Sequence, residues 1–66
     1  MNGLKLKGKR IENGLTQEDL AKKAGISSIS YCRKERGDRE FNCSEISNII
    51  VALKLSEKEV IEIFFR

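Results

Sequence analysis

Signals that stop and start helices recur along this chain of 66 residues, and they constrain its fold more than any other feature. Glycine stands at positions 14, 25 and 37. Glycine commonly ends a helix because it adopts left-handed backbone conformations without a steric penalty. Polar residues that cap helix N-termini recur between and after these glycines: Thr16, Ser27, Asn42 and Ser56. This punctuation predicts five short helices joined by connections of about three residues.

The same signals give approximate bounds for each helix. They predict helices over residues 5–13, 16–24 and 28–36, followed by two more that open at Asn42 and Ser56. Both of these caps have a glutamate three residues on, which is the spacing of a capping box. In the fourth predicted helix, apolar residues recur at i, i+3, i+4 and i+7, forming one stripe that faces a core. The stripe consists of Ile46, Ile49, Ile50 and Leu53.

The fifth predicted helix has more apolar surface than one core face needs. Its apolar residues spread over about 200° of the circumference, since successive helical residues are about 100° apart. We expect Val60, Ile63 and Phe64 to pack inward, which leaves Ile61 and Phe65. These two residues are either buried around the end of a small bundle or form a homodimer contact.

Composition agrees with one all-α domain over residues 1–66. Hydrophobic residues make up 39% of the chain, and proline, tryptophan and histidine are absent, which suits a compact helical unit. No apolar run approaches the ~18 residues of a membrane span, and no signal-peptide pattern follows the start, so we expect an intracellular protein. Cys32 and Cys43 form no Cys-x-x-Cys pair, and the chain has no histidine to complete a zinc site, which predicts free thiols and no metal site. The sequence implies no cofactor.

Charge is unevenly distributed along the chain. Residues 1–39 contain ten Lys or Arg against five Asp or Glu, whereas residues 40–66 contain three against five. A basic half is expected to face a polyanion, with the acidic half turned away. The alternative is that these charges only solvate the surface.

The most informative local pattern covers residues 15–27, where one helix ends, a three-residue turn opens with glycine, and another helix begins. This is the helix-turn-helix arrangement. Ala21 is small where the two helices are expected to cross, and Gly25 supplies the left-handed turn conformation. The apolar wedge between the helices is expected from Leu20, Ile26 and Tyr31.

Nearly the whole chain resembles the Cro/repressor-type (XRE) helix-turn-helix family of phage and bacterial regulators. The matching residues are Arg10, Gly14-Leu15-Thr16-Gln17, Leu20-Ala21, Gly25-Ile26-Ser27, Glu35-x-Gly37 and the helix that begins near Asn42. The resemblance implies a compact five-helix, lambda-repressor-like DNA-binding domain with its helix-turn-helix at the second and third helices. In that family the third helix enters the major groove, and a dimer binds a two-fold symmetric site.

The third predicted helix carries the candidate base-reading residues. A helical projection puts five side chains on one face, opposite Tyr31 and Lys34: Ser28, Ile29, Cys32, Arg33 and Arg36. The resemblance implies base reading at the first two, and Arg33 can form a bidentate contact with guanine. The alternatives are that Ile29 is buried, that Arg33 contacts a phosphate, and that Cys32 only fills space.

Phosphate contacts are expected around this helix. The resemblance implies that Gln17 contacts a phosphate and braces the third helix, the alternative being a helix-start residue without any contact. Further phosphate contacts are expected from Ser27, Arg36, Arg39 and Lys9. The family also pairs an arginine of the first helix with a glutamate late in the third, which implies a structural ion pair between Arg10 and Glu35.

Two residues depart from the family pattern. Lys34 occupies a core-facing position where an aliphatic residue is usual, and we expect its stem to pack while its ammonium reaches water. Gly8 lies inside the first helix and should destabilise it by ~1 kcal/mol relative to alanine.

The favoured function is sequence-specific binding of double-stranded DNA by a homodimer that regulates transcription by occupying its site, as a Cro-like protein or an isolated repressor head does. An enzyme is disfavoured because there is no histidine to activate a nucleophile and no phosphate-binding glycine loop. RNA binding is disfavoured because aromatic stacking platforms are missing. The remaining alternative is a helix-turn-helix interaction module or antitoxin-type regulator that binds a protein through its C-terminal apolar surface.

Overall fold

Every helix of the protein opens on a polar side chain that accepts a hydrogen bond from a backbone N–H three residues on. The computed structural model describes residues 1–66. Its five helices are α1 (Gly3–Glu12), α2 (Gln17–Ala24), α3 (Ser28–Arg36), α4 (Cys43–Leu53) and α5 (Glu57–Phe64), and it contains no strand. The all-α prediction and the four predicted caps are therefore confirmed.

Two bounds differ from the sequence-based prediction. α1 begins at Gly3, two residues early, because Asn2 accepts a hydrogen bond from the Lys5 backbone N–H at 3.1 Å and caps the helix. The connection between α3 and α4 covers residues 37–42 and is longer than expected. Phe41 in this connection is buried, so the segment contributes to the core instead of forming a minimal turn.

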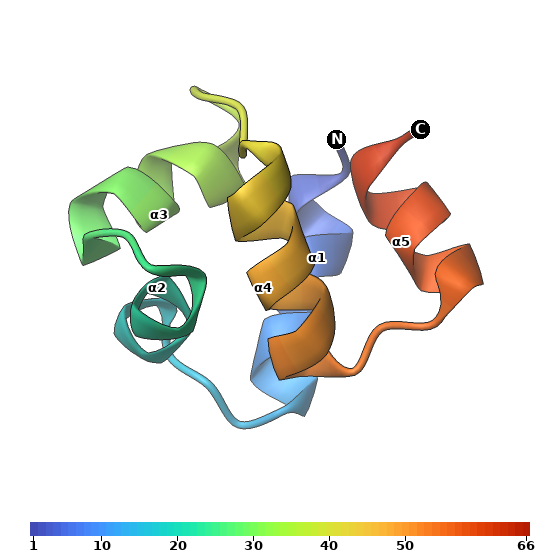
Figure 1. Cartoon of the computed structure of the whole chain (residues 1–66), viewed down its shortest axis with the longest axis horizontal. Coiled ribbons are helices and arrows are strands. Elements are labelled where there is room, and N and C mark those ends of the chain that lie inside the picture. Colours follow the sequence, from blue (N-terminus) through green and yellow to red (C-terminus); the bar gives the residue numbers. More distant parts are fainter.

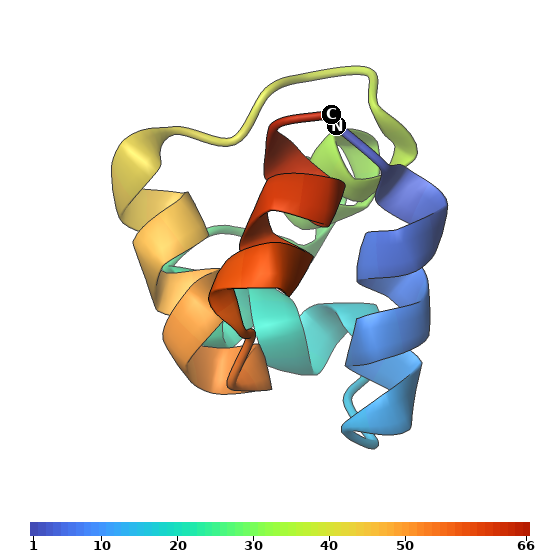
Figure 2. The same ribbon diagram turned by 90° about the vertical axis from the view of Figure 1, so that its right-hand side faces the viewer.

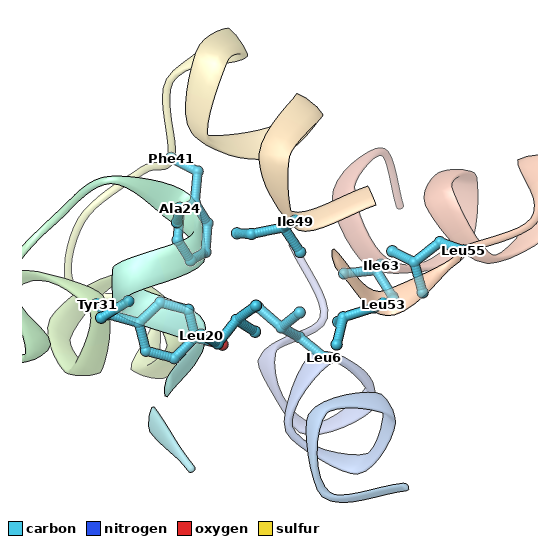
Figure 3. Packing of buried hydrophobic residues seen from close by; sticks show 10 residues of the cluster. Leu6, Leu20, Ala24, Tyr31, Phe41, Ile49, Leu53, Leu55 and Ile63 are labelled. Carbon is cyan, nitrogen blue, oxygen red and sulfur yellow. The ribbon is translucent and has the colours of Figure 1, made fainter. Parts of the chain in front are cut away.

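One buried apolar cluster draws residues from all five helices and from two connections (Figure 3). Tyr31, Leu6, Leu20, Ile49 and Ile63 are its fully buried large side chains. The Tyr31 and Phe41 rings lie 5.8 Å apart between centroids, which fixes the 37–42 connection against α3. The predicted stripe on α4 is confirmed, since Ile49 and Leu53 are buried and the remaining two residues are half-buried.

The two termini lie together beside the C-terminal end of α5 (Figure 2). Figure 1 shows α2 and α3 together on one side of the molecule and α5 on the other, and Figure 2 shows α5 between α4 and α1. The Asn2 backbone N–H donates to the Ile63 carbonyl at 2.6 Å. Ion pairs of Lys5 with Glu62 and of Lys9 with Glu59 also join α1 to α5.

The outer face of α5 carries the apolar residues that the sequence left without a core position. Ile63 is buried, whereas Val60 and Phe64 are half-buried against the cluster. Ile61 is 41% exposed and Phe65 is 69% exposed. The alternative in which the bundle buries this pair is therefore wrong. Among the helices, none is both long and apolar enough to cross a membrane.

Candidate nucleic-acid interface

The turn between α2 and α3 has the geometry that the glycine predicted. Gly25 has a φ of 81° in the left-handed region, and its backbone N–H donates to the Lys22 carbonyl at 3.2 Å. Ser27 then accepts from the Ser30 backbone N–H and starts α3. Leu20 and Tyr31 are fully buried between the helices, with Ile26 packed against the cluster. This packing turns the opposite face of α3 outward.

That outward face of α3 forms one wall of a shallow groove whose other wall includes Gln17 of α2. Its lining residues are Gln17, Ser28, Ile29, Cys32, Arg33 and Arg36. Ile29 is 68% exposed, which excludes the alternative that it lies in the core. The helical projection therefore predicted the composition of this face. Cys32 is half-buried, and both cysteines are free.

Beneath this face, the Glu35 carboxylate joins α1, α2 and α3. Oε1 accepts from Arg10 Nε at 2.9 Å and from the Tyr31 hydroxyl at 2.8 Å, while Oε2 accepts from Gln17 Nε2 at 2.8 Å. Arg10 also donates through Nη1 to the Leu15 carbonyl at 2.8 Å. The alternative that Gln17 makes no contact is therefore wrong, because its amide donates to Glu35 and braces the end of α3.

The same network sets the ionisation of its members. Burial opposes ionisation of Glu35, but the hydrogen bonds from Arg10, Gln17 and Tyr31 outweigh it and hold the carboxyl pKa below its usual value. Burial, followed by the bond to Glu35, raises the pKa of Tyr31. Glu35 is 5% exposed, so an ionised carboxylate there is stable only while these donors remain.

Lys34 has a partner that the sequence did not predict. Its ammonium lies 2.7 Å from Glu45 Oε1, and its side chain is 15% exposed. Glu45 Oε1 also accepts from the Asn42 backbone N–H at 3.1 Å, so the residue that completes the α4 capping box also binds α3. Local sequence could not reveal this pair, because its members belong to different helices. The pair ties α3 to α4.

The cations expected to contact phosphate are in different environments. Arg36 borders the groove and pairs with Asp38, whereas Arg39 is exposed. Lys9 instead lies toward α5, where it pairs with Glu59, and it also pairs with Glu12 of its own helix. The hydrogen bond with Lys9, and then the Ser56 backbone, lower the pKa of Glu59 to about 2.

Lys7 is the α1 cation on the α2–α3 side, and sequence reasoning missed it. It lines two grooves that also include Gln17; one reaches Ser28, and the other reaches Cys32 and Arg36. Helical spacing could have found it, because residues three apart share a face and Lys7 precedes Arg10 by three.

The fold and this geometry define a helix-turn-helix protein. α3, the second helix of the motif, has an exposed outer face. A model of the helix-turn-helix family (HTH_3) matches residues 6–60. The chain therefore belongs to the Cro/repressor-type (XRE) helix-turn-helix family of DNA-binding transcription regulators, with a lambda-repressor-like fold. No curated protein and no solved structure shows a significant match to it.

Proposed function

We propose that residues 1–66 form one domain that binds specific sequences of double-stranded DNA, with α3 in the major groove. The observation that carries the proposal is the outward face of α3, anchored from beneath through Glu35. Arg33 is proposed to form a bidentate contact with a guanine, and Ile29 to meet a thymine methyl. Ser28 can donate a hydrogen bond to a base edge or accept one from it, and Cys32 is proposed to face the bases between Ile29 and Arg33.

Phosphate contacts are proposed to set the register of α3 on the duplex. The Gln17 amide nitrogen carries two hydrogens, and its bond to Glu35 uses one, which leaves the other for a phosphate oxygen. The Ser27 hydroxyl accepts from Ser30 and keeps its own hydrogen to donate. Arg36 and Arg39 supply charge, as does Lys7. Lys9 is left out of this set, because two carboxylates already hold its ammonium.

A homodimer is proposed to place two copies of α3 in successive major grooves, ~34 Å apart on one face of the duplex. Ile61 and Phe65 supply the exposed apolar surface for the contact between copies. Such a protein regulates a promoter by occupying it, in the manner of a Cro-like protein or a repressor head. The proposed location is the cytoplasm of a bacterium or of a phage-infected cell, and the mechanism uses no cofactor.

Selection of bound duplexes from a random pool tests the proposal. A two-fold symmetric site should be enriched. Arg33→Ala should bind that site ~5- to 150-fold more weakly, since one bidentate base contact gives ~1–3 kcal/mol of discrimination, whereas its binding to scrambled duplex should be less affected. Affinity should fall steeply with salt as counterions are released. If no sequence is enriched and the chain instead binds a protein with an affinity that salt hardly changes, the interaction-module alternative is supported. The exposed apolar surface of α5 favours that alternative.

A further inference from the structure

The end of α3 brings a carboxylate onto a guanidinium of the proposed DNA-binding face. α3 ends at Arg36, and Gly37 reverses the chain with a φ of 93°. The Asp38 backbone N–H then donates to the Arg33 carbonyl at 2.9 Å. As a result, Asp38 Oδ2 accepts from Arg36 Nε at 2.8 Å and lies 2.6 Å from Nη2.

This pair has no structural partner beyond itself. The Arg36 side chain is 63% exposed and that of Asp38 is 53% exposed. Arg36 borders the groove of α3 and also the groove that contains Lys7. The carboxylate therefore stands on the surface where a DNA phosphate would bind, and not within the core of the fold.

The geometry of the pair weakens Arg36 as a phosphate ligand. Nε and one terminal nitrogen form an edge of the guanidinium that can grip a phosphate with two parallel hydrogen bonds. Both of these nitrogens face Asp38 Oδ2. While the pair is closed its net charge is zero, so it offers a phosphate little Coulomb attraction, and the nearby carboxylate repels the phosphate.

We propose that Asp38 competes with DNA phosphate for Arg36 and so lowers the affinity of this protein for duplexes of every sequence. The inference rests on the proposed function, in which Arg36 contacts a phosphate. An exposed ion pair contributes ~0.2–1 kcal/mol. Because DNA binding must break the pair between Arg36 and Asp38, the pair lowers the affinity by up to about fivefold. Phosphate contacts carry no sequence information. The ratio of affinities for a selected and a scrambled duplex is therefore unchanged by Asp38.

The test compares Asp38→Asn with Glu40→Gln in the full chain. Glu40 lies in the same connection, is exposed and forms no ion pair, so its substitution removes one negative charge without freeing an arginine. Fluorescence anisotropy against scrambled duplex should show Asp38→Asn binding ~2- to 5-fold more tightly than Glu40→Gln. The slope of log affinity against log salt should be the same for the two variants, because Arg36 engages a phosphate in both.

The Arg36→Gln background shows whether the effect passes through Arg36. In that background Asp38→Asn should gain no more affinity than Glu40→Gln. Equal gains in the wild-type background, or weaker binding by Asp38→Asn, would overturn the competition and leave the proposed function intact. A wild-type chain that binds neither scrambled nor selected duplex would overturn the proposed function itself. Thermal melts establish that the five variants, including Arg36→Gln itself, are folded under the assay conditions.

Discussion

Glu35 is the single residue on which the orientation of α3 most depends. Its carboxylate accepts from Arg10 on α1, from Gln17 on α2 and from Tyr31 on α3 itself. Removing it leaves Arg10, which is 7% exposed, without its charged partner. An uncompensated buried charge is strongly destabilising, even though the intact pair adds little net stability.

The lowered pKa of Glu35 predicts how stability depends on pH. Its carboxyl is more acidic folded than unfolded, so its contribution is complete above the ordinary value of 4.5 and is lost as the pH falls through the lower folded value. Glu35→Gln should lower the free energy of unfolding by ~2 kcal/mol at pH 7. In urea denaturation at pH 7, 4 and 3, the gap to wild type should narrow with falling pH. A constant gap would contradict an ionised Glu35.

Lys7 and Lys9 provide a matched pair on one helix. Lys7 borders the grooves next to Gln17, whereas Lys9 is held by Glu59 and Glu12. Lys7→Gln should therefore weaken binding to all duplexes about equally and reduce the salt slope by ~1. Lys9→Gln should leave anisotropy titrations nearly unchanged and lower the melting temperature at low salt. If Lys9→Gln weakens DNA binding more than Lys7→Gln does, Lys9 and not Lys7 is the α1 residue that contacts a phosphate.

At the scale of elements, the N-terminus of α1 approaches the end of α3 without room for a side chain. A Cβ built on Gly3 would overlap the Glu35 carbonyl oxygen, which is backbone and cannot rotate away. Gly8, in the same helix, has no heavy atom within 4 Å of the equivalent position. Both glycines are helical, but only Gly3 is required by close packing, because a side chain would fit at Gly8.

Alanine substitutions at these glycines should move stability in opposite directions. Gly3→Ala should destabilise the fold by ~1–3 kcal/mol, because α1 or the end of α3 must shift. Gly8→Ala should stabilise it by ~0.5–1 kcal/mol, because alanine loses less backbone entropy in a helix. Thermal or urea unfolding measures both. A neutral Gly3→Ala would mean that α1 and α3 can separate at little cost.

The bounds of a helix could be predicted from the sequence wherever residues close to its ends determine them. Caps and left-handed glycines act within four residues, so the bounds of α2 and α3 followed from Thr16, Gly25, Ser27 and Gly37. The burial of Phe41 did not follow, because a loop phenylalanine enters the core only once α3 and α4 have packed. For the same reason, the ion pair between helices that satisfies Lys34 lay beyond local reasoning. The outward face of α3 was predictable because helical periodicity alone defines it.

Across the whole molecule, the folded chain separates its charges further than the sequence does. Two lysines of the basic half, Lys5 and Lys9, are paired with glutamates of α5. The exposed cations without an ion pair are Lys7, Lys22, Lys23, Arg33 and Arg39 in the basic half, and Lys54 and Arg66 beyond it. Most cations available to a polyanion therefore lie on α1, α2 and α3 or directly after α3, whereas Lys5 and Lys9 neutralise two of the three glutamates of α5. This arrangement leaves α5 free for a contact that does not obstruct DNA.

The exposed surface of α5 predicts that two copies cooperate on a symmetric site. Phe65→Ser should reduce affinity for a selected two-fold site at least about fivefold, since truncating an interface anchor typically costs more than 1 kcal/mol. Binding to an isolated half-site should not change, because Phe65 lines none of the grooves that border α3. Val51→Ser is the control, as it removes a 77% exposed apolar side chain from α4 instead. If both variants bind the full site as wild type does, the copies bind independently and Phe65 has another partner.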